Sequence, residues 1–140
     1  MKPRLNIVTL GVKNLEFSRN FYKNALNWEP ARASDEAIAF YNQQGMVFAL
    51  YPLDKLAEDA NLSSEKQGFS GVTLAINLES KEAVDKLFAK VVDAGGRVLI
   101  EPRETFWGGY DAYFADPDGH TWEIAWAPFW EFDEQGSLKL

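Results

Sequence analysis

The side chains that we consider for acid–base chemistry lie near the C-terminal end of the sequence, in the run YDAYFADPDGHTWEIAW. This run contains Asp111, Tyr113, Glu123 and His120, which is the single histidine of the chain. A carboxylate among aromatic side chains loses hydration, and this suits a general base or an anchor for a cation. The sequence therefore makes Glu123 the leading candidate for a ligand-binding or catalytic group. The alternative is a carboxylate that pairs with a nearby Arg or Lys, or one that is simply hydrated.

The residue counts exclude several common kinds of site. The chain has 140 residues, one histidine and no cysteine. Iron sites of two histidines and one carboxylate, and histidine-rich zinc sites, need more histidine than this. The lack of cysteine excludes thiolate zinc sites, iron–sulfur clusters and thiol nucleophiles. A Ser–His–Asp triad would have to use His120, which we interpret as a structural residue of the turn over residues 116–120.

The charge pattern limits the partners. The net charge is −7, and the 14 basic residues are spread along the chain. Binding to nucleic acid needs clustered Lys or Arg, so we expect no nucleic-acid partner. No apolar run approaches the roughly 20 residues that cross a bilayer, and the N-terminus lacks the pattern of a secretory signal. We expect a cytoplasmic protein without a membrane partner, whose acidity favours cationic ligands or serves only solubility.

A repeated pattern must position the candidate residues. The sequence Val-Thr-Leu at residues 8–10 recurs at residues 72–74, and each copy alternates in the manner of a half-buried strand. A helix pattern follows each copy, with Asn14 and Ser80 as N-caps and with Asn27 and the Gly95–Gly96 pair as C-terminal stops. The residues expected on the apolar faces of these helices are Phe17, Phe21, Tyr22, Ala25 and Leu26 in the first, and Ala83, Val84, Leu87, Phe88, Val91 and Val92 in the second.

Short strands complete each half. Residues 37–42 and 46–51 are expected to pair around one turn, and residues 111–115 and 121–127 around another. The sequence thus predicts an α+β fold of two tandem βαβββ modules, at about residues 4–52 and 69–130, in a single domain. A polar connector over residues 53–68 is expected to hold one short amphipathic helix, and residues 131–140 to form an acidic tail that is frayed or packed at an edge.

These features resemble the vicinal oxygen chelate superfamily, which includes glyoxalase I, extradiol dioxygenases, fosfomycin-resistance enzymes and bleomycin-binding resistance proteins. The opening VTLGVKNLEFSRNFY, the closing YFADPDGHTWEIAW and the paired modules carry the resemblance over residues 4–130. It implies that the two modules form a curled mixed sheet around a cup for the ligand. It also implies a homodimer, with modules that pair within one chain or are exchanged between two.

The resemblance further implies four metal-ligand positions, which fall at Ile7, Ala49, Gly71 and Glu123. Only Glu123 has a ligating side chain. One carboxylate is too few to hold a transition metal, so we expect no metal and no other cofactor. Mg²⁺ with Asp111 as a second carboxylate remains an alternative.

Alternation along the strands then identifies residues on the cup face. The residues that share a strand face with the implied metal-ligand positions are small, among them Thr9, Gly11, Thr73 and Ala75. Small side chains leave room for a ligand, or they merely allow the sheet to curl. The loop over residues 107–110 gates the cup or is an ordinary hairpin turn, and Tyr113 matches a substrate-contacting tyrosine of the fosfomycin-resistance branch. The predicted ligand-binding residues are Thr9, Thr73, Trp107, Tyr110, Asp111, Tyr113 and Glu123.

The leading functional hypothesis is that the protein binds a small, cationic or aromatic molecule without a metal centre. The resemblance to the bleomycin-binding branch and the acidic, aromatic composition support it. The first alternative is an enzyme, namely a lyase, isomerase or dioxygenase that uses Glu123 as a base or as the sole carboxylate on a metal. The second is an interaction module without a ligand, in which residues such as Phe129 and Trp130 fill a dimer interface.

Overall fold

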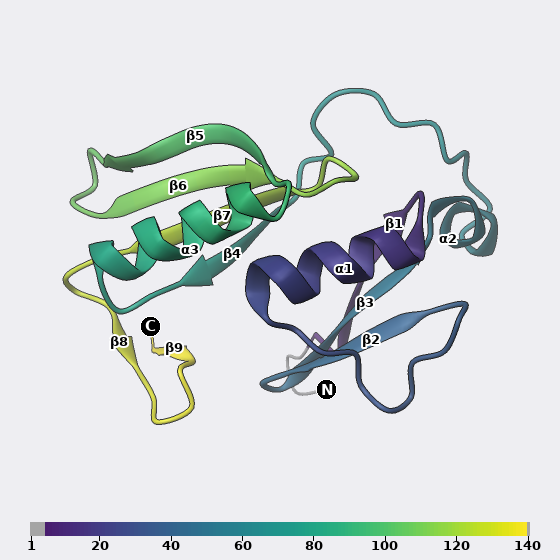
Figure 1. Cartoon of the computed structure of the whole chain (residues 1–140), viewed down its shortest axis with the longest axis horizontal. Coiled ribbons are helices and arrows are strands. Elements are labelled where there is room, and N and C mark those ends of the chain that lie inside the picture. The colour runs from purple at the N-terminus through teal and green to yellow at the C-terminus, as the bar shows by residue number, and fades with distance from the viewer. Residues whose placement is uncertain (1–4, 140) are drawn as a thin grey trace. The chain divides into compact units, whose positions relative to one another are not determined.

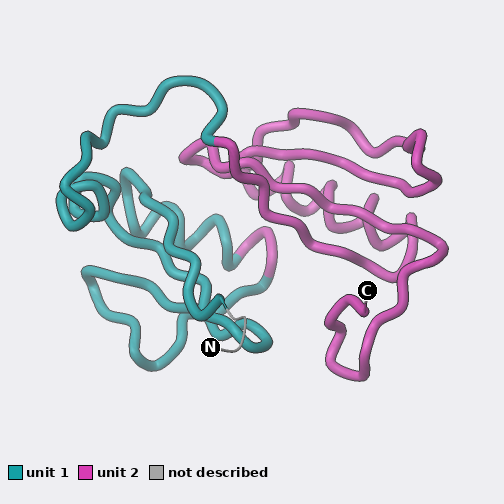
Figure 2. The backbone as a smooth tube through the Cα atoms, turned by 180° about the vertical axis from the view of Figure 1, so that it is seen from behind, with its two compact units in different colours: residues 1–23, 27–70 teal, residues 24–26, 71–140 magenta. Residues whose placement is uncertain are grey.

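The chain forms two compact units in a computed structural model, which describes residues 5–139. The first unit comprises Met1–Lys23 and Asn27–Ser70, and the second comprises Asn24–Leu26 and Gly71–Leu140 (Figure 2). Each unit contains its own sheet.

The first unit contains a three-stranded sheet. Its elements are β1 (Ile7–Val12), α1 (Leu15–Leu26), β2 (Ala39–Gln43), β3 (Met46–Pro52) and α2 (Leu53–Asp59). The strand order is β1-β3-β2, with β3 parallel to β1 and antiparallel to β2. Asn14 caps α1 by accepting a hydrogen bond from the amide of Phe17, and Asn27 ends the helix in the left-handed conformation, at φ 58°. Both predicted helix boundaries are confirmed.

An aromatic cluster forms the core between α1 and this sheet. The ring of Tyr22 is fully buried and packs at 5.2 Å from Phe48, at 5.8 Å from Trp28 and at 6.4 Å from Tyr41. The buried stripe of the helix runs through Ser18, Phe21, Tyr22 and Ala25. Phe17, expected on the apolar face, is instead 62% exposed, because the stripe centres on Ser18 and leaves residue 17 at its solvent edge.

The first module has one strand fewer than predicted. Residues 28–38, between α1 and β2, turn back on themselves without pairing in the sheet. The side chain of Asp35 accepts hydrogen bonds from the amides of Ala37 and Ile38, which holds a tight turn. Arg19 on α1 then donates to the carbonyl oxygens of Asp35 and Ile38. These local bonds satisfy backbone groups that a strand ladder would otherwise have used.

The second unit has the full βαβββ order of a predicted module. It consists of β4 (Thr73–Asn77), α3 (Lys81–Asp93), β5 (Arg97–Glu104), β6 (Tyr110–Ala115) and β7 (Thr121–Trp126), in the strand order β4-β7-β6-β5. Ser80 caps α3 as predicted, by accepting from the amide of Ala83. Figure 1 shows α3 lying along one face of this sheet.

That helix-covered face holds the core of the second unit. Val84, Phe88 and Val91 of α3 are buried, as are Phe114, Trp122 and Ile124 on the strands beneath. The rings of Phe114 and Trp122 stack at 6.1 Å with an interplanar angle of 5°. Since strand side chains alternate between faces, the residues next to these three along each strand point to the opposite side of the sheet. We call that opposite side, which carries Thr73, Ala75, Asp111, Tyr113 and Glu123, the open face.

The acidic tail is more ordered than expected. Residues Glu131–Phe132 (β8) pair antiparallel with Leu138–Lys139 (β9). The carboxylate of Asp133 accepts hydrogen bonds from the amides of Gln135 and Ser137, which closes the turn between the two strands. These backbone bonds lower the pKa of Asp133, since they favour its ionised form.

The short helix α2, which the connector pattern predicted, packs on β1 at a glycine. A Cβ atom built on Gly11 would lie 2.6 Å from Leu53 Cδ1 and 3.1 Å from Leu53 Cα. The space that we expected Gly11 to leave for a ligand is therefore filled by Leu53. The reason is that α2 starts directly after β3 and folds back across the neighbouring strand.

We expect Gly11→Ala to destabilise the first unit by about 1–3 kcal/mol, since the new methyl group overpacks a site that Leu53 already fills. Urea unfolding followed by circular dichroism measures this. The double variant with Leu53→Ala should recover part of the loss by freeing the space. An equally large loss in both backgrounds would show that Leu53 is not the neighbour that crowds residue 11.

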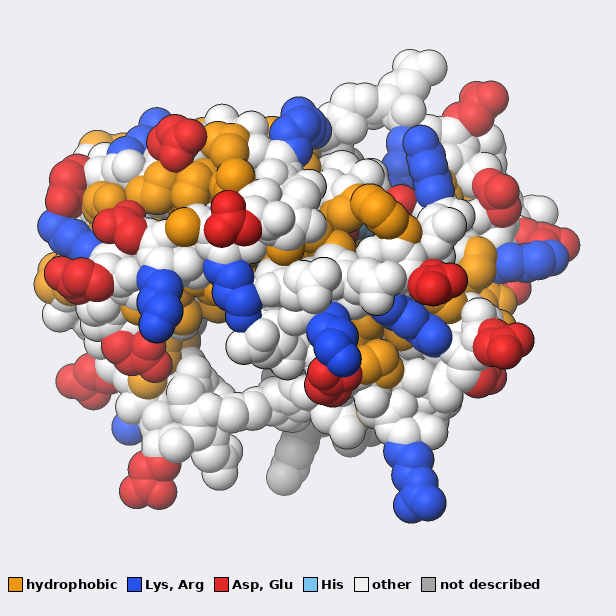
Figure 3. Space-filling view, in the orientation of Figure 1, with side chains coloured by type: hydrophobic (Ala, Val, Ile, Leu, Met, Phe, Trp, Pro, Cys, Tyr) orange, Lys and Arg blue, Asp and Glu red, His pale blue; other side chains and the backbone are white. Residues whose placement is uncertain are grey.

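The surface carries charged side chains of both signs, and the helices are short. On the face drawn in Figure 3, Lys and Arg side chains are interspersed with Asp and Glu. Within residues 5–139, no helix is long and apolar enough to span a membrane.

Candidate functional site

The open face of the second sheet brings together Tyr113 and Glu123. These residues lie directly opposite each other on β6 and β7. The phenol of Tyr113 donates a hydrogen bond of 2.8 Å to Glu123 Oε1, and both side chains are partly buried. Ala75 on β4 is the register partner of Glu123 on its other side and is exposed. A carboxylate and a phenol thus stand, partly buried, on the strand face opposite α3, beside a small residue.

A second polar pair lies beside the first. Asp111, two residues before Tyr113 on β6, is only 4% exposed and accepts a hydrogen bond of 3.3 Å from Arg103 Nε of β5. Arg103 is the register partner of Asp111. The Arg103 side chain remains 56% exposed, and its bond to Asp111 depends on the irregular pairing of β5 with β6, which is not visible in the sequence. A basic residue on a strand that pairs with a buried acid was the one signal that could have revealed the pair.

Burial and the hydrogen bond to Glu123 raise the pKa of Tyr113 to about 12. Loss of hydration disfavours the phenolate, and the neighbouring carboxylate accepts the phenolic proton and repels a second negative charge. Tyr113 therefore remains a neutral donor throughout the physiological range, and Glu123 is held by it in one orientation.

We expect Glu123→Gln to lower the pKa of Tyr113, because the substitution removes the negative charge that opposes its ionisation. Ultraviolet titration of the phenolate, with Tyr113→Phe to assign the signal, measures the shift. The raised pKa makes the native state hold its proton more tightly than the unfolded chain. The wild-type protein should therefore lose stability as the pH rises from 10 towards 12, and Tyr113→Phe should lose less. An unchanged phenolate titration in Glu123→Gln would contradict the pairing.

The turn between β6 and β7 holds this pair in register. Asp116 has a fully buried side chain, whose Oδ1 accepts from the amides of Asp118 and His120. Its Oδ2 lies 2.7 Å from His120 Nδ1. His120 thus serves the turn, in agreement with its interpretation as a structural residue.

Two predicted ligand-binding residues lie elsewhere in the second unit. Tyr110 lies three residues before Tyr113 on β6, so its side chain points to the opposite, helix-covered side of the sheet. There its hydroxyl donates a hydrogen bond of 2.8 Å to Asp85 of α3. Trp107 belongs to a closed turn in which the amide of Gly109 donates to Thr105 Oγ1. A Cβ on Gly109 would lie 1.9 Å from the ring of Trp107, so this glycine permits the ring to fold over the backbone. The loop has the bonding of an ordinary hairpin turn.

The remaining two predicted residues lie in separate units. Thr73 is exposed on β4 and shares the open face of Glu123, with Thr121 as its register partner. Thr9 is on β1 of the first unit, opposite Ala49. Of the seven predicted residues, the structure places Thr73, Asp111, Tyr113 and Glu123 on one face of one sheet.

The four metal-ligand positions implied by the resemblance do not fit a transition metal. Ile7, Ala49 and Gly71 have no donor in their side chains, and Gly71 lies before β4 in a left-handed conformation, at φ 78°. Among the described residues, no group of three or more His, Cys, Asp or Glu side chains comes close enough to hold a metal ion. A tight transition-metal site needs several such ligands.

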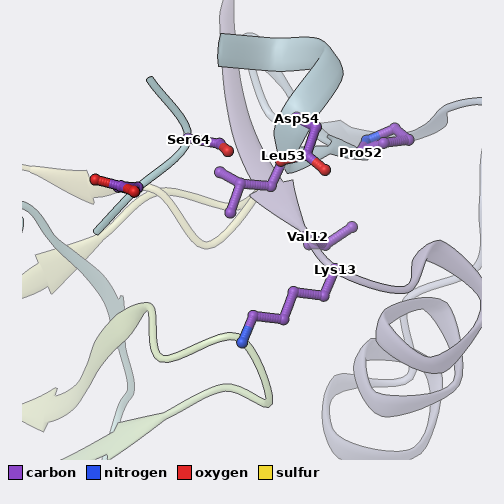
Figure 4. Close-up of a pocket in the computed structure, with 7 residues that line it drawn as sticks. Val12, Lys13, Pro52, Leu53, Asp54 and Ser64 are labelled. Carbon is purple, nitrogen blue, oxygen red and sulfur yellow. The ribbon is translucent and has the colours of Figure 1, made fainter. Parts of the chain in front are cut away.

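The first unit contains a pocket of about 370 Å³ at the end of β1, shown in Figure 4. Its walls come from β1, the segment joining β3 to α2, and the connector that follows α2. The lining residues are Val12, Lys13, Pro52, Leu53, Asp54, Ser64 and Glu65. The sequence did not indicate it, since the connector was predicted only to be polar and to hold one short helix.

Comparison with known proteins gives the family. The model of the Glyoxalase/Bleomycin resistance protein/Dioxygenase superfamily matches residues 4–124. A glyoxalase-related enzyme from Fulvimarina pelagi is 34% identical, with a TM-score of 0.90 over 98% of this chain and 97% of that one. A superfamily enzyme from Burkholderia phytofirmans, 21% identical with a TM-score of 0.79 over 89% of this chain and 99% of that one, shares the fold.

A curated relative is also similar. The metallothiol transferase FosB of Shouchella clausii is 26% identical over 121 residues, which are 86% of this chain and 77% of that protein. The family match spans both modules, and the α+β elements agree with it. The chain belongs to the glyoxalase/bleomycin resistance protein/dioxygenase superfamily.

Proposed function

We propose that the protein binds a small molecule with a cationic group on the open face of its second sheet, without a transition metal. The observation that supports this most is the Tyr113–Glu123 pair, which combines a 2.8 Å hydrogen bond with partial burial on a face that α3 does not cover. Polar groups fixed in this way on a partly apolar surface are typical of ligand sites.

The charges on this face favour a cation. Arg103 compensates the charge of the buried Asp111. Glu123 bonds the neutral Tyr113, so these contacts give its carboxylate no positive partner. Tyr113 remains neutral because its pKa is raised to about 12. In this proposal Glu123 contacts the positive group of the ligand, while Tyr113 orients the carboxylate. The net charge of −7 adds long-range attraction for cations.

Binding of bleomycin tests the proposal, since bleomycin is a cationic aromatic compound named in the family description. We expect it to raise the unfolding temperature of the wild-type protein, and Glu123→Gln to weaken the binding measured by calorimetry by about tenfold or more. Glu101→Gln, an exposed carboxylate on β5, is the matched control and should bind as the wild type does. Absence of binding, or equal affinity in both variants, would contradict the proposal.

A second candidate function is group transfer by an enzyme. It rests on the similarity to FosB, whose name describes a metallothiol transferase. In that case Glu123 would act as a base or as a metal ligand. Metal analysis of the purified protein, together with thiol consumption in the presence of fosfomycin, distinguishes the two functions. Stoichiometric metal bound through Glu123 and consumption of thiol would favour the enzyme.

We further propose that the protein is a homodimer. Large apolar side chains that remain exposed support this, among them Ile7 at 50%, Phe129 at 61% and Phe106 at 103%. A partner that covered such side chains would remove their apolar surface from water, which is favourable. Size-exclusion chromatography with light scattering should give twice the monomer mass of 15.8 kDa, and the monomer mass itself would contradict the proposal.

A further inference from the structure

The ends of three neighbouring strands in the second unit bring an acidic and two aromatic side chains together. Glu104 ends β5, Tyr110 starts β6 and Trp126 ends β7. Tyr110 is the register partner of both Glu104 and Trp126, so the three side chains stand in a row on the face that α3 covers. Figure 1 shows the N-terminal end of α3 at the same end of the sheet as the hairpin between β5 and β6. We call these three residues the cage.

An ammonium group occupies the cage. Lys81, the first residue of α3, places its Nζ 5.5 Å from the centre of the Trp126 ring and 5.6 Å from the centre of the Tyr110 ring. The same nitrogen lies 2.5 Å from Glu104 Oε1. Both ring distances are within the roughly 6 Å at which an aromatic face attracts a cation. Two ring faces and a carboxylate are thus observed around one cation, and this shows which ligand chemistry the cage takes.

Asp85 fixes one wall of the cage and adds a second negative charge. The Tyr110 hydroxyl donates a hydrogen bond of 2.8 Å to Asp85, one helical turn after Lys81 on α3. This bond, loss of hydration and the charges of Asp85 and Glu104 raise the pKa of Tyr110, so the ring remains neutral. Two carboxylates therefore act on this ring against the one ammonium of Lys81, which favours a cation in the cage.

Lys81 holds its place weakly. Its side chain is 40% exposed and that of Glu104 is 67% exposed, and ion pairs at such positions contribute little because water screens them. Lys81 also lies in the first turn of α3, where the helix dipole disfavours a positive charge. The ammonium of lysine is strongly hydrated, whereas a quaternary ammonium group has no N–H to donate to water and gains more from the ring faces. A ligand of that class can therefore displace Lys81.

We propose that the cage binds a small molecule through a quaternary ammonium group, and that Lys81 is its intramolecular competitor. The ligand cation contacts the faces of Tyr110 and Trp126, and Glu104 compensates its charge. Lys81 returns to the cage when the ligand leaves. The site lies on the face of the sheet opposite Glu123 and does not depend on the function proposed for the open face.

The test compares choline with 3,3-dimethylbutan-1-ol, which has the same shape without the charge. In a titration followed by nuclear magnetic resonance, we expect choline to bind the wild-type chain, with contacts between its N-methyl groups and the ring protons of Trp126. The uncharged compound should bind about tenfold more weakly or less still, because the cation–ring attraction is lost. Lys81→Ala should bind choline about tenfold more tightly, since the cage is then always open. Adding Tyr110→Leu to that variant should remove most of this gain.

Matched controls locate the binding and separate competition from a general change in charge. Lys86→Ala removes an exposed lysine from the same helix outside the cage, and it should bind choline as the wild type does. Glu123→Gln should also leave choline binding unchanged. Lys81 and Lys86 are not part of the buried core, so their variants should retain the circular dichroism of the wild type. Absence of choline binding to the wild type, equal affinity of wild type and Lys81→Ala, equal binding of the uncharged compound, or loss of binding in Glu123→Gln would overturn the proposal.

Discussion

Replacing Tyr22 by alanine is expected to reduce the free energy of unfolding of the first unit by about 3–5 kcal/mol. Tyr22 is fully buried, and its ring contacts Trp28 of the loop after α1 and Phe48 of β3. Truncation would leave a cavity between α1 and the sheet, which a close-packed interior fills only partly. Urea unfolding, followed by circular dichroism and by tryptophan fluorescence, measures the loss.

Phe17→Ala on the same helix is the matched control. It removes a side chain of similar size and the same aromatic class, but Phe17 is 62% exposed. We expect a loss of less than about 0.5 kcal/mol, as for most surface positions. A loss at position 17 comparable with that at position 22 would mean that α1 presents a different face to the sheet.

The second large effect is expected at Asp116. Alanine at this position removes the acceptor for two amides and for His120, and leaves these donors without their buried partner. Breaking a buried pair of this kind costs about 3–5 kcal/mol. Chemical denaturation of Asp116→Ala should show this loss, together with weaker protection of the β6 and β7 amides in hydrogen exchange.

The same bonding pattern offers a control in the tail. Asp133 accepts from the amides of Gln135 and Ser137, as Asp116 does from Asp118 and His120, but it lies in the small β8–β9 hairpin. Asp133→Ala should therefore have a much smaller effect on global unfolding. Equal effects would indicate that the tail hairpin is part of the main cooperative unit.

Asp116 also links stability to the site. Its turn fixes the register that sets Tyr113 opposite Glu123. If the turn loosens, the 2.8 Å hydrogen bond between these two side chains should weaken, and the raised pKa of Tyr113 should fall towards its ordinary value. Asp116→Ala therefore tests whether the turn positions the candidate ligand-binding pair.

Local features could be predicted from the sequence. The caps Asn14 and Ser80 and the left-handed stop at Asn27 depend on residues within one helical turn, and they appear as predicted. The hairpin strands on either side of the turn over residues 116–120 also agree, because turn chemistry is local. The repeated motifs were sufficient to indicate the superfamily, which the family comparison confirms.

Tertiary packing decided the rest. The sequence pattern predicted both Phe17 and Tyr22 on the apolar face of the first helix. The position of α1 against its sheet buries Tyr22 and exposes Phe17. Likewise Gly11 was predicted to open space that Leu53 occupies. Each of these outcomes depends on a contact between segments distant in the chain, and periodicity specifies the face of an element but not what covers it. The sequence by itself therefore determined the elements and the family, and the three-dimensional packing determined which side chains share the open face and the pocket.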